Sequence, residues 1–324
     1  MLKWHTFVQP PRQGTSHKKH GNSPCQDKAT VKENGKLIAA VLADGLGSLE
    51  YSSIAAETIT GTIASFLLNY DYRQFREERL KSDVLAECEN ALNKCSGLLN
   101  ISITKMDCTL LFVVVFKRDS FFIIGQLGDG AICVVKQNQA FQFLALDDKH
   151  MSSSNMTKTV LSSDASDYFI LRSFHVPDCL GVFITSDGLE NELYSKAGRV
   201  KQNIQWYYNL IGNNDASRCV FEIGAKWDEL ASDDKFGFTD DMSLIAIIQP
   251  NKHIELPEEA NWLCICGHRN RMESSRCESC GKDITKIYKG VSFKQNGGKL
   301  EFFSRLNGDP DEEARILRKY CVYK

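Results

Sequence analysis

The pattern of apolar and polar residues predicts a strand hairpin followed by two helices in the first third of the chain. The apolar run from Leu37 to Ala43 follows the turn signal Glu33-Asn34-Gly35 and a shorter, more polar strand-like segment. This arrangement is typical of two antiparallel strands joined by a tight turn. Apolar residues then recur every three or four positions over residues 54–67 and again over residues 80–98. Such spacing gives each segment one apolar face, so we expect two amphipathic helices.

The middle of the chain changes to short apolar runs that predict consecutive antiparallel strands. Between residues 108 and 146 these runs are separated by polar turns, and apolar residues occupy both faces of each expected strand. A strand that is apolar on both faces needs cover on each side, from another sheet or from helices. Farther along, the pattern predicts strands at residues 168–176, 181–185 and 242–248, and helices at residues 200–210 and 215–230.

Composition and charge narrow the setting in which this fold is expected to work. The 324 residues are 43% hydrophobic and 25% charged, and the formal net charge of −2 does not indicate nucleic acid or a membrane as a partner. The N-terminus lacks the apolar core of a secretory signal, and the longest apolar run, residues 110–116, is too short to span a bilayer. We therefore expect a soluble, cytoplasmic protein.

Aspartate residues stand at the ends of several expected strands. Asp27 and Asp44 bound the predicted hairpin, Asp187 follows a later strand, Asp240 precedes the last strand, and Asp129 lies between two glycines. A single aspartate beside glycine is most often a turn or cap residue. Gathered in one cleft, however, these carboxylates would repel one another unless cations neutralised them, and oxygen ligands favour magnesium or manganese. The pattern therefore indicates a hard-metal site.

Five ordered motifs carry a resemblance to the metal-dependent protein phosphatases, protein phosphatase type 2C. The motifs are QD at 26–27, ADGLG at 43–47, LGDG at 127–130, TSDGLEN at 185–191 and TDDMSLIAI at 239–247. The wider pattern from Ser16 to Asp27 is similar to a bacterial branch of that family. The resemblance covers about residues 1–250. It implies an α+β fold, a four-layer αββα sandwich of two antiparallel sheets flanked by helices.

The resemblance also implies a serine/threonine phosphatase site with two manganese or magnesium ions. Asp44 would bridge the two ions, with the Gly45 carbonyl on one of them, while Asp187 and Asp240 would complete the other. Asp27 would hold metal-bound water at the edge of the site. A water activated by both ions would then attack the phosphorus of phosphoserine or phosphothreonine.

The chain departs from the family pattern where the substrate phosphate is gripped. Asn22 stands where many members have an arginine that binds the phosphate. The neighbouring His17 and His20 are candidates to bind phosphate in its place. A solvated basic loop is the alternative interpretation of this stretch.

Two further departures concern the metal ligands. Asn191 replaces a usual aspartate ligand of a third metal ion, which leaves Asp129 as the other candidate for that site. In the last motif Asp241 takes the place of a usual asparagine, so Asp240 has an acidic neighbour. These departures keep a second hypothesis open, in which the chain is a catalytically weak or inactive phosphatase-like protein that recognises phosphorylated partners.

Four cysteines near the C-terminus are spaced as in a structural zinc site. Cys264 and Cys266 precede Cys277 and Cys280, and four thiolates suit a tetrahedral zinc ion with no open position. The other cysteines are scattered, which favours a reducing compartment over disulfides. The pattern from Trp262 to Asn270 is similar to small zinc-ribbon fingers of the Ran-binding-protein type. Such fingers bind proteins, ubiquitin or RNA.

We therefore expect two domains. Residues 1–250 would form the phosphatase-like catalytic domain, and residues 251–324 the zinc-ribbon finger with a C-terminal hairpin and helix. The expected partner of the first is a phosphorylated protein, such as a cognate serine/threonine kinase or its targets. The zinc module would bind a protein partner, or it would act as a stabilising cap on the catalytic domain.

Overall fold

The structure, a computed structural model, divides the chain into two compact units, Met1–His253 and Ile254–Lys324. The residues that it describes are 4–15, 24–118, 121–136, 141–143, 157–176, 179–193, 203–232, 240–249, 261–263, 269–271, 276–279, 281, 283, 291–296, 299–304 and 321–322. Assignment of the two units as a catalytic domain and a zinc module stays a prediction.

One sheet of the first unit contains five described strands in the order β2-β3-β4-β5-β8, all antiparallel. The predicted hairpin forms its first two strands. Asn34 holds the turn between them, because its side-chain oxygen accepts the N–H groups of Lys36 at 2.8 Å and Leu37 at 2.9 Å. The strands are β2 (Lys28–Glu33), β3 (Leu37–Ala43), β4 (Leu110–Phe116), β5 (Phe121–Leu127) and β8 (Ile170–His175).

The second sheet contains five described strands in the order β1-β10-β9-β6-β7, again all antiparallel. Its edge strand β1 was not predicted, since it carries Pro10 and Pro11 where the pairing with β10 shifts register. Proline has no N–H to donate and is tolerated in a sheet at an edge or a bulge. The strands are β1 (His5–Arg12), β10 (Met242–Ile248), β9 (Cys179–Thr185), β6 (Ala131–Lys136) and β7 (Phe141–Phe143).

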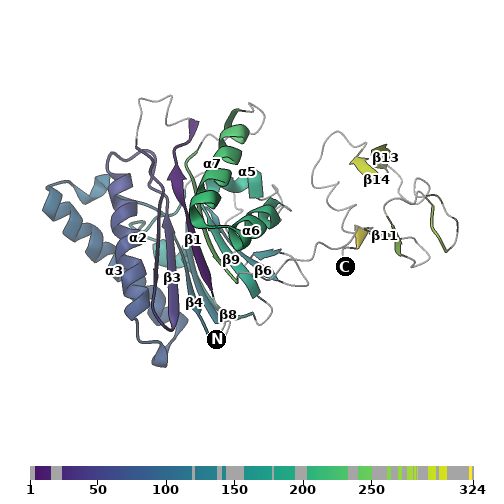
Figure 1. Ribbon diagram of the computed structural model, residues 1–324. Helices are drawn as coiled ribbons and strands as arrows, with labels where there is room; N and C mark the ends of the chain where they lie inside the picture. The colour runs from purple at the N-terminus through teal and green to yellow at the C-terminus, as the bar shows by residue number, and fades with distance from the viewer. Residues whose placement is uncertain are drawn as a thin grey trace. The chain divides into compact units, whose positions relative to one another are not determined.

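Helices cover the outer face of each sheet (Figure 1). Helices α2 (Ser52–Asn69) and α3 (Glu77–Leu99) confirm the two predicted amphipathic segments and pack on the first sheet. Helices α6 (Asn203–Asn213) and α7 (Ala216–Ser232) lie against the second, where the Arg12 guanidinium of β1 donates to the Gly224 carbonyl of α7 at 2.6 Å.

The two sheets pack face to face over a second apolar core. Alternate residues of β3 and β4, including Ile38, Leu42 and Val113, meet Val182 of β9 and Ile245 of β10, and all are fully buried. The strands are therefore covered on both faces, as their apolar runs predicted. This arrangement confirms the predicted α+β fold with an αββα sandwich (Figure 1).

Short helical turns complete the first unit. None of the helices among the described residues has both the length and the apolar content needed to cross a lipid bilayer. The short elements are η1 (Tyr72–Gln74), η2 (Ile103–Lys105), α4 (Ala165–Tyr168), η4 (Asp187–Leu189) and α5 (Glu190–Leu193).

The described part of the second unit consists of short strands. Strands β13 and β14 pair antiparallel from Val291↔Ser304 to Asn296↔Lys299, which is the hairpin expected there. The other strands form a small sheet in the order β12-β11-β15. The predicted helix near the C-terminus lies outside the described residues. The strands are β11 (Asn261–Leu263), β12 (Arg269–Arg271), β13 (Val291–Asn296), β14 (Lys299–Ser304) and β15 (Cys321–Val322).

Candidate active site

Strand register brings the first two predicted acids to one edge of the first sheet. Lys28 of β2 pairs with Ala43 of β3, so Asp27 and Asp44 occupy adjacent positions just beyond the paired ends of the two strands. The backbone of Asp44 is tied to β4 as well, because its N–H donates to the Thr109 hydroxyl at 2.9 Å and its carbonyl accepts the Thr109 N–H at 2.8 Å.

Register in the second sheet places three further acids together. Thr185 of β9 pairs with Ala131 of β6 on one side and with Leu244 of β10 on the other. Asp187 therefore lies near Asp129 and Asp240, which precede those two strands. The structure thus positions all five strand-end aspartates at the edges that the sequence indicated.

Asp27 is the most deeply buried of these acids. Its exposed fraction is 0%, and neither carboxylate oxygen is aligned with a hydrogen-bond donor among the described residues. Burial raises its pKa to about 6, the hydroxyl groups of Ser186 and Ser243 lower it, and the charge of Asp241 raises it again. The Ser186 hydroxyl also donates to the Asp241 carbonyl at 3.3 Å.

The carboxylates at the strand ends of one sheet affect the pKa values of those at the strand ends of the other. Burial raises the pKa of Asp44 far above its usual range, and the charges of Asp27, Asp187 and Asp240 raise it further. The pKa of Asp187 rises to about 7, first from burial and then from the charges of Asp240, Asp27 and Asp129. These shifts mean that the edge carries more negative charge than its own donors stabilise.

Among the described residues, no three carboxylate, imidazole or thiol groups converge on one point in the manner of a preassembled metal site. The aspartates lie around a common edge, and their roles as ligands stay predictions. Asp129 is exposed, and Thr157 donates to its carboxylate at 2.5 Å. The phosphate-binding candidates His17 and His20 lie outside the described residues.

Gly45 is required by a close approach of helix α2. A Cβ atom on Gly45 would lie 2.7 Å from the carbonyl carbon of Ser52, the first residue of that helix. The bonds on either side of Gly45 run from Leu46 N–H to the Asp107 carbonyl and from Thr109 N–H to the Asp44 carbonyl. These bonds make Gly45 and Cys108 an isolated antiparallel bridge, and the role of the Gly45 carbonyl as a metal ligand stays a prediction.

Gly188 meets the backbone of the last motif in the same way. A Cβ atom on Gly188 would lie 2.0 Å from the Asp241 carbonyl oxygen. The N–H of Ser243 donates to the Ser186 hydroxyl at 3.0 Å, which ties the two strand ends that carry Asp187 and Asp240. These serines were not predicted, because their partners are distant in sequence.

Comparison with protein-family models identifies the chain. The model described as protein phosphatase 2C matches residues 13–219, well over half of the sequence. The chain belongs to the protein phosphatase 2C family. Metal dependence is general to this family, whose members use manganese or magnesium. No curated protein matches the chain.

Solved structures of protein phosphatases share the fold of this family member. A bacterial serine phosphatase superposes with a TM-score of 0.52 at 13% identity, over 78% of this chain and 100% of that chain. The serine/threonine phosphatase of S. agalactiae gives 0.51 at 17% identity, over 76% and 99%. Stp1 of Staphylococcus aureus gives 0.50 at 12% identity, over 76% and 95%. At such low identities the likeness concerns the fold alone.

A second buried network of this phosphatase-family domain supports the turn that carries Asp187. Glu192, with a side chain only 3% exposed, pairs with Lys226 of α7 at 2.6 Å. The Lys226 ammonium also lies 4.4 Å from the ring centre of Trp206, a cation–π contact. Tyr207 donates weakly to the Glu192 carboxylate at 3.4 Å and accepts from the Trp227 indole at 2.8 Å.

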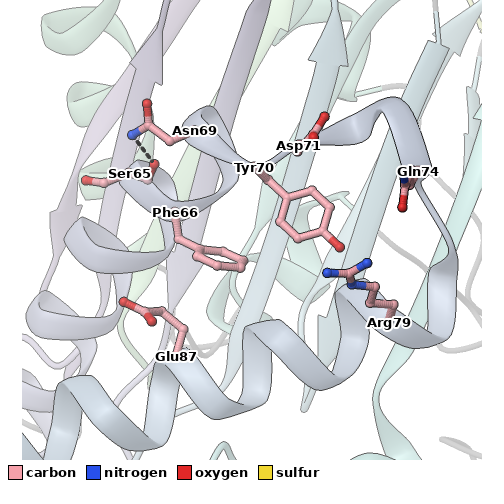
Figure 2. Close-up of a pocket in the computed structure, with 8 residues that line it drawn as sticks. All are labelled: Ser65, Phe66, Asn69, Tyr70, Asp71, Gln74, Arg79 and Glu87. Atoms are coloured by element: carbon pink, nitrogen blue, oxygen red, sulfur yellow. Dashed lines mark hydrogen bonds between the residues drawn. The ribbon is translucent and has the colours of Figure 1, made fainter.

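A cavity of about 540 Å³ lies at the other end of α2 and is not part of this site (Figure 2). Helix α2 has 18 residues, so its far end is about 27 Å from Ser52. Several polar groups there already pair with neighbours: Tyr70 donates to Asp83 at 3.2 Å, and Arg79 lies 3.6 Å from it. The lining residues are Ser65, Phe66, Asn69, Tyr70, Asp71, Gln74, Arg79 and Glu87.

The predicted zinc site falls almost entirely outside the described residues. Cys264, Cys266 and Cys280 lie outside them, whereas Cys277 is described and buried. Its carbonyl accepts the N–H of Gly281 at 2.8 Å, and Gly281 has a left-handed backbone with φ of +70°. The zinc ligands stay a prediction.

Proposed function

We propose that the chain is a metal-dependent serine/threonine protein phosphatase that hydrolyses phosphoserine or phosphothreonine with two manganese or magnesium ions. The observation that carries the proposal is the strand register, which places Asp27 and Asp44 at the paired ends of β2 and β3 and Asp187 and Asp240 at neighbouring strand ends of the other sheet. A cluster of like charges that are buried or half-buried is unfavourable by itself, and divalent cations would neutralise it.

The donor set suits hard divalent cations. It consists of carboxylate oxygens and a backbone carbonyl, the ligands that magnesium and manganese prefer. Both oxygens of the buried Asp27 lack an aligned donor among the described residues, so they are available to a bound ion or its water. A structural zinc site would use thiolate or imidazole groups, whereas Asp44, Asp187, Asp240 and the Gly45 carbonyl are oxygen donors.

Each acid has a distinct role in this proposal. Asp44 and the Gly45 carbonyl would hold one ion, Asp187 and Asp240 would hold the other with Asp44 shared, and Asp27 would orient water. When bound, two divalent ions lower the pKa of a shared water and neutralise charge on the phosphoryl oxygens. The chain's own part is to keep these oxygens at fixed strand ends, so that no residue needs to form a covalent intermediate.

Hydrolysis of p-nitrophenyl phosphate and of a phosphothreonine peptide in the presence of manganese tests the proposal. The wild type should show metal-dependent turnover. Asp44→Asn and Asp187→Asn should each remove at least about 99% of it, because loss of a ligand weakens binding of the ions that activate the attacking water. Asp83→Asn is a matched control, because it makes the same charge change on helix α3.

The alternative function gives a different result in the same experiment. A phosphatase-like binding protein would bind the phosphothreonine peptide without turning it over. Wild-type turnover no higher than that of Asp44→Asn, together with measurable peptide binding by calorimetry, would favour that alternative and reject the proposed activity.

A further inference from the structure

The carboxylate of Asp241 joins two segments that are distant in sequence. One of its oxygens accepts the N–H of Gly14 at 2.7 Å, and the other accepts the N–H of Gln26 at 2.6 Å. The side chain is buried, with the residue only 1% exposed. Hydrogen bonds from an N–H to an ionised carboxylate are short and about twice as strong as those between neutral groups.

The two N–H groups lie just beyond strands of different sheets. Gly14 follows β1, the edge strand that pairs with β10, whereas Gln26 precedes β2 of the other sheet. Asp241 itself precedes β10. One buried carboxylate therefore fixes both ends of the chain segment between residues 14 and 26, at the edge where the acids meet.

Gln26 carries this constraint to the proposed metal ligands. Its carbonyl accepts the N–H of Gly45 at 3.2 Å, and its side-chain amide donates to the Ser52 hydroxyl at 2.7 Å. The residue after it is Asp27. A shift of the Gln26 backbone would therefore move Asp27 and the turn that holds Asp44.

We propose that Asp241 is a positioning residue, which holds Gly14 and Gln26 in place and does not bind metal. Each of its oxygens accepts a main-chain N–H group and the side chain is buried, whereas Asp240 is partly exposed at the same edge. The kinetic test of this role rests on the proposed phosphatase function, whereas the tests by proteolysis and manganese binding do not. Asp241, which stands where an asparagine is usual, therefore need not act as a further metal ligand.

The chemistry of the bonds shows why a carboxylate differs from an amide here. An asparagine has one acceptor oxygen, and its NH₂ group would face the second N–H donor without forming a bond. Asp241→Asn should therefore keep one of the two bonds and lose the other, while Asp241→Ala should lose both. The ordered series of wild type, asparagine and alanine separates positioning from a general loss of packing.

Limited proteolysis tests the positioning directly. The segment between Gly14 and Gln26 contains Lys18 and Lys19, which trypsin can recognise. Losing one charge-assisted bond should raise the rate of cleavage there roughly tenfold in Asp241→Asn and further in Asp241→Ala, because cleavage tracks local opening. Asp83→Asn is the control, with an expected rate equal to that of the wild type. Equal rates for Asp241→Asn and wild type would overturn the inference.

Manganese binding and kinetics distinguish a positioning residue from a ligand. Calorimetry should give Asp241→Asn a manganese affinity weaker by roughly tenfold, as for the loss of a supporting bond, whereas Asp240→Asn should lose binding. The kcat of Asp241→Asn should fall roughly tenfold through the shifted Asp27. If Asp241→Asn lost manganese as Asp240→Asn does, Asp241 would be a ligand. If the wild type had no turnover, the proposed function would fail, while proteolysis and metal binding would still decide the role of Asp241.

Discussion

Asp44 lies beside the fully buried Asp27 at the paired ends of β3 and β2. Because Asp27 is fully buried and Asp44 is half-buried beside it, the two carboxyl groups cannot both be charged without an electrostatic penalty. The pKa of each is raised, and burial is the leading cause for both. The metal-free protein is therefore locally destabilised at the edge that carries the proposed metal ligands.

Asp44→Asn should stabilise the metal-free protein while it abolishes turnover. The amide has nearly the same shape and carries no charge, so the penalty of the buried acid pair disappears. We expect the free energy of unfolding at pH 7 to rise by about 1 kcal/mol or more, since one unit of pKa shift corresponds to about 1.4 kcal/mol. Urea unfolding in the presence of EDTA measures this change. A destabilised Asp44→Asn protein would contradict the electrostatic argument.

Stability of the metal-free protein should fall as the pH rises from about 4 to about 7. Asp27 and Asp187 have pKa values raised from 3.8 to about 6 and about 7, so in this window the folded state binds more protons than the unfolded state. Stability then decreases with rising pH, and it is highest where both states are protonated. Thermal unfolding at several pH values with EDTA checks the slope, and added manganese should flatten it by binding only the folded, ionised site.

The local pattern of apolar and polar residues was sufficient to predict most strands and helices of the phosphatase fold. Continuous apolar runs marked strands that are covered on both faces, and the spacing of three and four residues marked α2 and α3. The edge strand β1 was missed because Pro10 and Pro11 interrupt its pattern. Its strand conformation depends on pairing with β10, which lies at the other end of the domain.

The placement of the candidate acids at strand ends was predictable for a similar reason. Each aspartate follows or precedes an apolar run, and glycine beside Asp44 and Asp187 signals a close backbone approach. The role of Asp241 was not predictable, because its partners Gly14 and Gln26 are more than 200 residues away. Only the folded arrangement shows that Asp241 accepts two distant main-chain N–H groups, whereas Asp240 accepts the neighbouring N–H of Asp241 at 2.9 Å.

Gly188→Ala should disrupt the candidate site, whereas Gly61→Ala should stabilise the protein. A methyl group on Gly188 would meet the Asp241 carbonyl oxygen at 2.0 Å, and a backbone atom cannot move aside. We expect a loss of about 3 kcal/mol or a failure to fold. Gly61 lies within helix α2 with no atom within 4 Å of an added Cβ, so alanine should add about 0.5–1 kcal/mol. Urea unfolding of both variants makes the comparison, and equal effects would contradict it.

Removing Lys226 should destabilise the protein more than removing the charge of Glu192. Lys226→Met leaves a carboxylate that is only 3% exposed without its cation, and loss of one partner of a buried pair costs about 3–5 kcal/mol. In Glu192→Gln, the Lys226 ammonium keeps partial exposure to water and its contact with the Trp206 ring. A double-mutant cycle with urea unfolding measures the coupling.

The exposed pair Arg218 and Glu222 on the same helix is the matched control for that cycle. Its atoms lie 3.5 Å apart with the Arg218 side chain 61% exposed, so its coupling should be below about 0.5 kcal/mol. Equal coupling energies for the two pairs would show that burial does not strengthen the Glu192–Lys226 contact.

Cys277→Ser should remove one zinc ion from the chain. Cys277 is buried, and the N–H of Gly281 donates to its carbonyl, with Gly281 in the left-handed conformation that closes a tight turn. A thiolate at this position would complete a tetrahedral site with Cys264, Cys266 and Cys280. Metal analysis of the purified protein should give one zinc per wild-type chain and none for Cys277→Ser. Cys95→Ser is the control, since Cys95 is a half-buried thiol of α3 that accepts from Thr58 at 3.4 Å. An unchanged zinc content in Cys277→Ser would exclude this cysteine as a ligand.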